Sequence, residues 1–550
     1  MHTRRVRSVV GLIALPFTTA AGVYLASTPA PEAQSVTRHP VTVEQILRNP
    51  PHVETAPAPR LSARELEALR LRKLELRERL DSLVDNNPPS PPGLPHVRGR
   101  ETQVVDPQAE FHGTPGTFVI GRNNPNPMAA TSGVGSTLAE PGAANNGVHV
   151  FYTGNTHAEF STDGGATYTA VTIPGGPDDA PIACCDLDVL LDNARRVTFW
   201  SVLYLNSGGT NGVIRIFVRP DIPLANSCSY DIDPAGTANN ITPDYPHLGL
   251  SNNHLYLTTN NIGSAGWVGA QVRRFNIDQM ADCAATVTTD VFTYKGRVGQ
   301  RVLVPAQGAW ETIYWGMLEN TTTFRIFQWK QTSPTPTSVT RIIQASTFAN
   351  PDCRGGVGNF DFIERSTAWS ITGFRLRGAV GKGQIAFFWN VGPDSAHPQG
   401  HVHAAVFSEG SFSLLAQPHI FNSAFCFGYP AVAANKRGDL GMTIAAGGKA
   451  GGGGTAAQGF VGMDDDFTSG IGNFGTFALT AAGTHNRSDG RYGDYFTAHP
   501  WEPCEKWFNA TNYALNGGSA TTNVNARYVE FGRNRDKKCY DNWNTQAPTP

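Results

Sequence analysis

The sequence predicts an all-β fold, a seven-bladed β-propeller, with six or eight blades as the alternatives. Only 16% of the 550 residues are charged and 58 are glycine, which is typical of turn-rich β proteins. From about residue 115 onward, short strands with alternating apolar residues follow one another in a repeat of about 50–65 residues. One such repeat has two apolar faces and cannot bury either alone, whereas repeats stacked in a ring bury both.

The second strand of each repeat carries the clearest signal. These segments read VHVFYTGN, VTFWSVLYLN, HLYLTTNN, TIYWGMLEN, IAFFWN, LGMTIAAGG and KWFNATNY. Most of them end at or beside an asparagine: Asn155, Asn206, Asn260, Asn320, Asn390 and Asn512. Asparagine tolerates a left-handed backbone and bonds to nearby main chain, so we interpret these residues as structural turn residues. The segment around Thr117–Gly121 would supply the outer strand that closes the ring.

Residues 1–33 have the pattern of an export signal. Three arginines, Arg4, Arg5 and Arg7, precede an apolar run from Val9 to about Ala26, and small residues and prolines follow. Because no clean cleavage site is visible, an uncleaved membrane anchor is the alternative. Both interpretations predict a secreted, periplasmic or cell-surface protein.

Residues 34–114 differ in composition and are interpreted as a proline-rich spacer with one amphipathic helix at 62–85. Leucines follow heptad spacing along this helix, so it is either a solvated spacer or a short self-association helix. The predicted propeller takes residues 115–540, and residues 541–550 form a tail.

The eight cysteines all follow residue 183, and an even number in an exported chain favours disulfides. Their connectivity is left open by the sequence. The simplest pairing joins Cys228 to Cys283, Cys353 to Cys426 and Cys504 to Cys539, and leaves the adjacent Cys184 and Cys185 to each other. That vicinal disulfide would either border a ligand site beside the central channel or stiffen the connector, with copper binding as a third option.

The stretch STDGGATYT has the spacing S-x-D-x-G-x-T-aromatic. It resembles the BNR/Asp-box repeats of sialidase-like propellers, and the chain is similar to exported bacterial members of unassigned function. The resemblance implies that Ser161, Asp163, Gly165, Thr167 and Tyr168 form a structural turn between the third and fourth strands of a blade. True sialidases also carry an early F/Y-R-I-P motif, which is missing here, so the resemblance implies no catalytic residue.

Connectors between successive blades lie on one face of a propeller, and here they carry most of the reactive polar side chains. Converging arginines bind carboxylate or sulfate groups in forked geometry, and aspartate with tyrosine suits acid/base work on a glycosidic bond. The candidate ligand-binding residues are Asp186, Asp244, Tyr245, Arg297, Arg301, Arg354, Asp361, Arg491, Tyr492 and Asp494. The alternative is that these residues pair with one another and tie blade to blade.

The sequence predicts no metal site and no cofactor. His401 and His403 point to one side of a strand, but no third ligand is evident. There is no phosphate-binding loop or nucleophile elbow, and a net charge of −2 argues against nucleic-acid binding.

These observations favour an exported propeller that recognises an extracellular glycan on its connector face, with an anionic glycan as one option. One alternative is a glycoside hydrolase or polysaccharide lyase of sialidase-like fold. The other is an envelope scaffold or a protein-interaction propeller.

Overall fold

The computed structural model describes most of the region predicted to be the propeller and two short segments before it. Within these residues, no helix has the length and apolar character needed to cross a membrane. The predicted signal segment 1–33 and the predicted helix 62–85 lie outside them. The described residues are 37–44, 102–103, 118–126, 139–220, 228–234, 240–264, 266–295, 303–348, 352–363, 376–464, 474, 477–493, 496–517 and 523–544.

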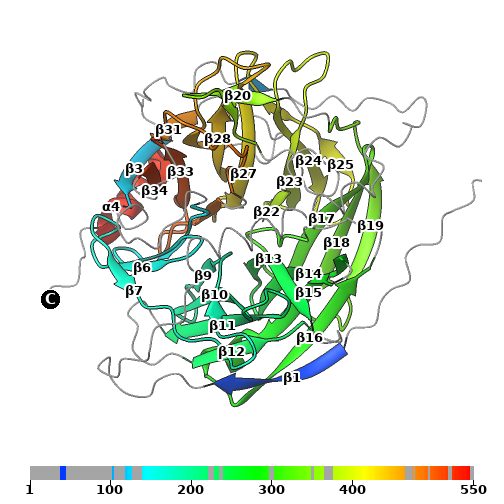
Figure 1. Ribbon diagram of the computed structural model, residues 1–550. Coiled ribbons are helices and arrows are strands. Elements are labelled where there is room, and N and C mark those ends of the chain that lie inside the picture. The colour runs from blue at the N-terminus through cyan, green and yellow to red at the C-terminus, as the bar shows by residue number, and fades with distance from the viewer. Residues whose placement is uncertain are drawn as a thin grey trace, which may run out of the picture. The chain divides into compact units, whose positions relative to one another are not determined.

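The protein is all-β, and its strands form antiparallel groups that follow one another around a common centre (Figure 1). The first group is β4 (Gly142–Asn145), β5 (Val150–Thr153), β6 (Ala158–Ser161) and β7 (Thr169–Val171). The second is β8 (Ile182–Ala183), β9 (Asp188–Asp192), β10 (Val197–Leu205), β11 (Gly212–Pro220) and β12 (Cys228–Ile232). The third is β13 (Ile241–Leu250), β14 (His254–Gly263), β15 (Gly266–Asn276) and β16 (Thr286–Tyr294), with helix α3 (Ile277–Ala281) before β16.

The remaining groups continue the ring. The fourth is β17 (Thr312–Asn320), β18 (Thr323–Lys330) and β19 (Thr337–Ile342), and the fifth is β22 (Arg377–Gly381), β23 (Gln384–Val391), β24 (His401–Ser408), β25 (Leu414–Ala416) and β26 (His419–Phe421). The sixth is β27 (Cys426–Ala434), β28 (Leu440–Gly447), β30 (Gln458–Asp464) and β31 (Phe477–Ala481). The last is β32 (Thr497–Pro500), β33 (Phe508–Leu515), β34 (Val524–Arg533) and β3 (Phe118–Pro125). This is a β-propeller, as the sequence predicts.

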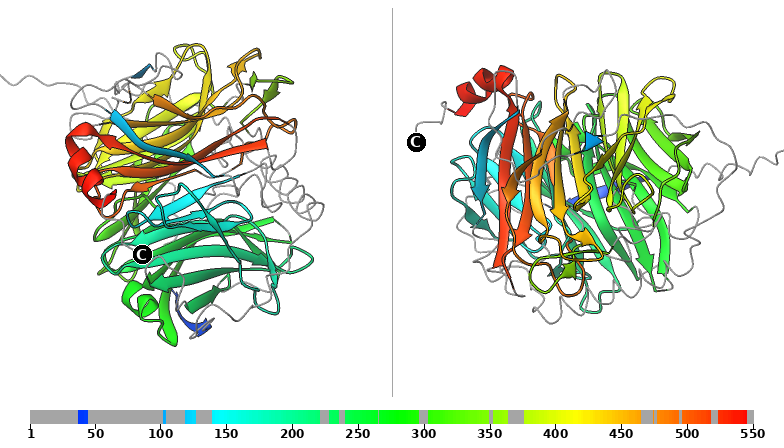
Figure 2. Two further views of the ribbon diagram at one scale, coloured as in Figure 1. Left: turned by 90° about the vertical axis from the view of Figure 1, so that its left-hand side faces the viewer. Right: turned by 90° about the horizontal axis from the view of Figure 1, so that it is seen from above.

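The last group takes one of its strands from far back in the chain. Strand β3 pairs antiparallel with β34, so that Phe118 lies opposite Arg533, and Figure 2 shows the two strands side by side. Strand β33 of the same group contacts β4 of the first. The ring is therefore closed by non-covalent pairing of an early strand with a late one, at the segment that the sequence predicts.

Apolar residues are buried mainly between neighbouring groups. One core cluster joins Phe151 of the first group to Trp200 and Phe217 of the second. Another joins Tyr256 of the third group to Trp315 of the fourth, and similar clusters follow around the ring. This is the burial that stacking of two-faced sheets provides.

Two segments of the predicted spacer form strands on outer edges of the propeller. Strand β1 (Thr37–Glu44) pairs with both β12 and β16 and joins two groups into one 10-stranded sheet. Strand β2 (Thr102–Gln103) pairs with β26. Since β1 joins two groups into one hydrogen-bonded sheet, the number of sheets does not give the number of blades. The blade count of seven therefore stays a prediction.

Smaller elements tie loops to this frame. Strand β20 (Cys353–Gly355) pairs with β21 (Phe360–Asp361) and β29 (Lys449–Ala450). The last described elements are η2 (Asn534–Asp536) and α4 (Lys537–Asn544), which follow β34.

Candidate functional site

Strands β4, β9, β13, β22, β27 and β32 line the centre of the ring and are called the inner strands. Strand β9 contacts both β4 and β13, and β27 contacts both β22 and β32. Each of these inner strands begins at a connector from the previous group and ends at a turn into its own second strand. We call these two ends the connector end and the turn end, and they open toward opposite faces.

At the connector end the structure brings together Asp186 and the pair Asp244–Tyr245, all predicted from the sequence. The Asp186 carboxylate accepts a hydrogen bond from the Tyr245 backbone N–H at 3.3 Å. The Arg377 guanidinium, from the fifth group, lies 5.5 Å from the centre of the Tyr245 ring. Since Tyr245 belongs to the third group, this contact joins two groups that are not consecutive in the ring. All four side chains are buried.

Asp188 is a further buried carboxyl of this cluster. Burial raises its pKa to about 6, while hydrogen bonds from the Leu248 and Val189 N–H groups, each at 2.9 Å, and the charge of Arg377 oppose the rise. The His247 Nδ1 atom lies 3.9 Å from the same carboxylate. The connector end is thus a buried polar network held by backbone donors.

The other described candidates also bond within the protein. Arg354 pairs with Asp352, Asp361 accepts the Ile363 N–H, the Arg491 N–H donates to Asp489, and Tyr492 stacks on Tyr513. Apart from Arg354 these candidates are buried, so they offer little surface to a ligand. Arg297, Arg301 and Asp494 lie outside the described residues.

All eight cysteines form disulfides, and the pairs are those of the simplest pairing: Cys184–Cys185, Cys228–Cys283, Cys353–Cys426 and Cys504–Cys539. Cys184 and Cys185 are buried in the apolar cluster between the second and third groups, together with Leu203 and Leu248. This position favours the stiffening role of the vicinal disulfide over a role beside a ligand.

The STDGGATYT segment is the turn between β6 and β7. The Asp163 carboxylate accepts hydrogen bonds from the Thr167 N–H (2.8 Å) and hydroxyl (2.6 Å). The Ser161 hydroxyl oxygen accepts the Gly165 N–H at 2.7 Å, and Gly165 has a φ of +80°. The Tyr168 ring packs on Tyr152 with centroids 5.7 Å apart. These contacts give the segment a structural role in the turn.

A cavity of about 580 Å³ lies at the turn end of the inner strands. Its lining comes from the ends of β4, β9, β13, β22, β27 and β32 and from the segment that precedes β17. The polar lining residues are Asn145, Asp192, Asn193, Arg195, Ser251, Asn252, Gln307, Lys382, Asn435, Lys436, His499, Glu502, Glu505 and Asn509. None of these was a candidate from the sequence, because the turns between first and second strands read only as chain reversals.

An exposed tryptophan stands at this cavity. The Trp310 side chain is 67% exposed, and its carbonyl accepts the Asn252 N–H at 2.7 Å, which fixes the backbone beneath it. Large aromatic side chains are usually buried or used in binding. The signal in the sequence was a lone tryptophan in a polar turn, QGAWET.

Four buried polar atoms of cavity residues lack a hydrogen-bond partner within the described part of the chain: Ser251 Oγ, His499 Nε2, Glu502 Oε2 and Asn509 Oδ1. Burial, with repulsion from Glu505 and Asp192, raises the pKa of Glu502 to about 8, although Lys436 opposes this. Glu502 is therefore mostly protonated near neutral pH and can both donate and accept a hydrogen bond. Buried polar atoms of this kind call for a partner.

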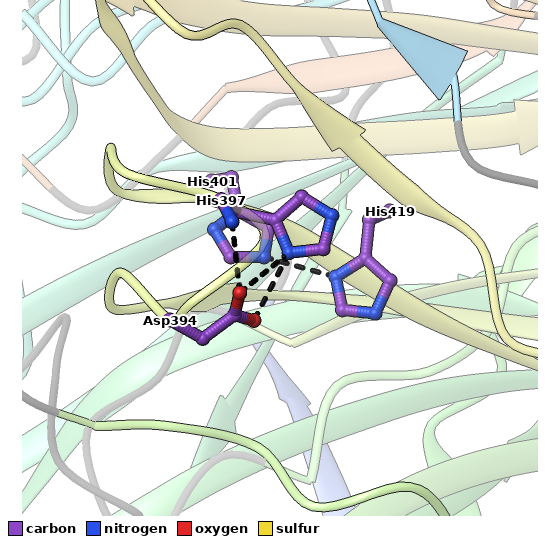
Figure 3. A group of neighbouring side chains, drawn as sticks. All are labelled: Asp394, His397, His401 and His419. Atoms are coloured by element: carbon purple, nitrogen blue, oxygen red, sulfur yellow. Dashed lines mark hydrogen bonds and ion pairs between the residues drawn. The ribbon is translucent and has the colours of Figure 1, made fainter. Parts of the chain in front are cut away.

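A second polar cluster lies in the fifth group, where Figure 3 shows Asp394, His397, His401 and His419 pointing toward one another. The sequence analysis considered His401 with His403 and found no third ligand. The structure instead combines His401 with three residues from a loop and from β26. The spacing D-x₂-H-x₃-H from Asp394 to His401 is a signal that a search for short ligand spacings would have found.

No family model and no curated protein matches this chain. Solved structures with a similar fold include a triple arginine-to-alanine mutant of AofleA from Arthrobotrys oligospora, with 12% identity, 72% of this chain and 97% of that chain covered and a TM-score of 0.35. The GH93 α-L-arabinofuranosidase of Fusarium graminearum in complex with arabinobiose has 9% identity and a TM-score of 0.34, and the match covers 71% of this chain and 92% of that chain. Trypanosoma rangeli sialidase has 7% identity and a TM-score of 0.37. The match covers 68% of this chain and 57% of that chain, so it spans little more than half of that enzyme.

Proposed function

We propose that this protein binds a glycan in the cavity at the turn end of its inner strands, with Trp310 as the stacking surface. The observation that carries the proposal is the exposed indole beside a cavity in which buried polar atoms of His499, Glu502 and Asn509 have no partner among the residues that the structure describes. A sugar ring has an apolar C–H face that packs on an aromatic ring and a rim of hydroxyl groups. Those hydroxyls would donate to Asn509 Oδ1 and exchange hydrogen bonds with Glu502.

The charges of the cavity favour a neutral glycan over an anionic one. Its lining contains three basic side chains, Arg195, Lys382 and Lys436, and three carboxyls, Asp192, Glu502 and Glu505. Arg195 pairs with Asp192 at 2.8 Å and Lys436 with Glu505 at 2.6 Å, so little net positive charge is left for a sulfate or uronate. The predicted connector-face site remains a separate hypothesis, since Arg297, Arg301 and Asp494 belong to it.

The test is a glycan array on the full exported chain, followed by calorimetric titration of each hit. Trp310→Ala should weaken binding at least about tenfold, because a central aromatic contact carries much of the affinity of such sites. Leu415→Ala is the matched control, since this 48% exposed apolar residue does not line the cavity, and it should bind as the parent does. Binding that survives Trp310→Ala and Glu502→Gln but is lost in Arg354→Ala would overturn the cavity assignment in favour of the connector face.

Hydrolysis is the second candidate function, and the raised pKa of Glu502 is the observation that favours it. A carboxyl that stays protonated near neutral pH suits the general acid of a glycosidase. If array hits are cleaved and Glu502→Gln stops the cleavage while binding persists, the protein is an enzyme. If no glycan binds, the scaffold interpretation stands in its place.

A further inference from the structure

Asp394, His397, His401 and His419 converge from three elements of the fifth group. Asp394 and His397 lie in the loop between β23 and β24, His401 begins β24, and His419 begins β26, which pairs antiparallel with β24. One donor atom from each residue lies within 4.8 Å of the donors of the others. The sheet therefore fixes two imidazoles, and the loop adds an imidazole and a carboxylate (Figure 3).

The protonation of His401 follows from its neighbours. Its Nδ1 lies 3.0 Å from the Gln399 carbonyl oxygen, and since a carbonyl can only accept, Nδ1 carries the hydrogen. The lone pair of Nε2 then points at the His419 Nδ1, 2.9 Å away. An imidazole oriented in this way by a backbone carbonyl is the usual arrangement of a metal-binding histidine.

The other members are oriented toward the same point. The His397 Nδ1 lies 2.9 Å and 3.0 Å from the two Asp394 carboxylate oxygens. The three imidazoles are buried, with ring centroids 4.4 to 5.1 Å apart.

We propose that Asp394, His397, His401 and His419 bind one divalent first-row transition metal, of which Zn²⁺ fits best. Three imidazole nitrogens and one carboxylate oxygen are a donor set that Zn²⁺ takes tetrahedrally, with donors about 3.3 Å apart around the ion. The observed separations, from 2.9 Å to 4.8 Å, bracket this value. Because four protein ligands fill the tetrahedron and three of them are buried, the site is structural and not catalytic.

His403 supports the site without being a ligand. Its ring stacks on His419 at 4.3 Å, and its Nδ1 lies 3.0 Å from the Ser346 hydroxyl, which also accepts the Trp389 indole N–H at 3.2 Å. This contact fixes the plane of the His419 ring. A bound metal would then join the loop at Asp394 to the outer strand β26, which His397 of the loop contacts through ring packing on His419 and Phe421.

The experiment measures metal content and thermal unfolding of the full chain purified without chelators. We expect about one zinc per chain, a fall in the unfolding temperature after chelator dialysis, and recovery on addition of Zn²⁺ alone. Co²⁺ in place of Zn²⁺ should give the strong visible absorption of a tetrahedral site. His401→Ala and His419→Ala should abolish both effects, whereas His485→Gln, outside the cluster, should leave them unchanged.

Asp394→Asn keeps the test valid if the histidine variants fail to fold. Asp394 is the solvent-exposed member of the cluster, so its variant should fold and bind Zn²⁺ at least about tenfold more weakly than the parent. A folded parent chain that takes up no stoichiometric zinc or cobalt, and whose unfolding temperature does not respond to either, would overturn the proposal. So would an Asp394→Asn variant with unchanged affinity.

Discussion

Several inner strands contain, or closely follow, one non-glycine residue with a left-handed backbone. Asp186 precedes β9 with a φ of +57°, and Tyr245 in β13 and Tyr429 in β27 have φ values of +55° and +56°. Such a backbone costs about 1–2 kcal/mol per residue. The Asn155 and Asn390 side chains offset part of the cost by accepting the N–H groups of Asp186 and Tyr429, each at 3.1 Å. These bends turn the connector-end side chains toward the centre.

Gly165 should not tolerate a side chain. An added Cβ would lie 2.6 Å from the Tyr168 hydroxyl and 2.9 Å from the Tyr528 ring, whereas at Gly383, with a similar φ of +73°, it would meet nothing within 4 Å. Both alanine variants carry the left-handed cost of about 1–2 kcal/mol, and Gly165→Ala should lose about 1–3 kcal/mol more by overpacking. Denaturant unfolding measures both, and equal losses would contradict the clash.

Glu502 should make the stability depend on pH. Its pKa is about 8 in the folded chain and about 4.5 when solvated, so the folded state holds an extra proton between these values. Stability should therefore fall as the pH rises from about 5 to about 8 and level off above that. The Glu502→Gln variant lacks this titration. Its unfolding free energy should therefore rise relative to that of the parent as the pH increases from about 5 to about 8. A difference that stays constant from pH 5 to pH 8.5 would rule this out.

At the scale of the strand, the asparagines that end the second strands have more than one role. The Asn206 and Asn320 side chains accept backbone N–H groups within their own turns, as the sequence predicts. Asn155 and Asn390 instead bond to the inner strand region of the next group. The same residue type therefore serves a turn in some groups and a link between groups in others.

Asn390→Ala should be costlier than Asn206→Ala. Asn390 is fully buried, and its loss removes the acceptor of a buried N–H, for which we expect about 1–3 kcal/mol. Water can replace Asn206 at its half-buried turn, so we expect less than about 1 kcal/mol there. Denaturant unfolding of the two variants is the measurement, and a larger loss for Asn206→Ala would contradict the link between groups.

At the scale of the whole molecule, stability rests on closing the ring. Strand β3 supplies Arg122, whose Nε lies 3.2 Å from the fully buried carboxylate of Glu530 on β34. Tyr528 and Tyr540 donate hydrogen bonds to the same carboxylate at 3.0 Å and 2.5 Å. Removing β3 would leave the backbone edge of β34 unpaired and the buried Glu530 carboxylate without the Arg122 cation. Both changes are costly.

Two truncations isolate this closure. A chain that begins at residue 127 lacks β1, β2 and β3, whereas one that begins at residue 115 lacks β1 and β2 only. The shorter chain should unfold at a clearly lower temperature or aggregate, and the longer one should keep a cooperative transition. Thermal unfolding of the pair is the measurement, and coincident transitions would mean that β3 does not close the ring.

The sequence by itself determined the all-β propeller. Alternating apolar residues give each repeat two apolar sheet faces, and these faces are buried only when successive repeats stack in a ring. It also indicated the outer strand that begins at Phe118, whereas it left the cysteine pairing open, and the structure has the simplest of the possible pairings. Only the tertiary structure decided which polar residues share a site. Trp310, Glu502 and Asn509, or Asp394 and His419, lie apart in the chain and belong to turns and loops whose local patterns look ordinary. The cavity residues meet because the inner strands end around one centre. The histidine cluster forms because the outer strand β26 pairs with β24.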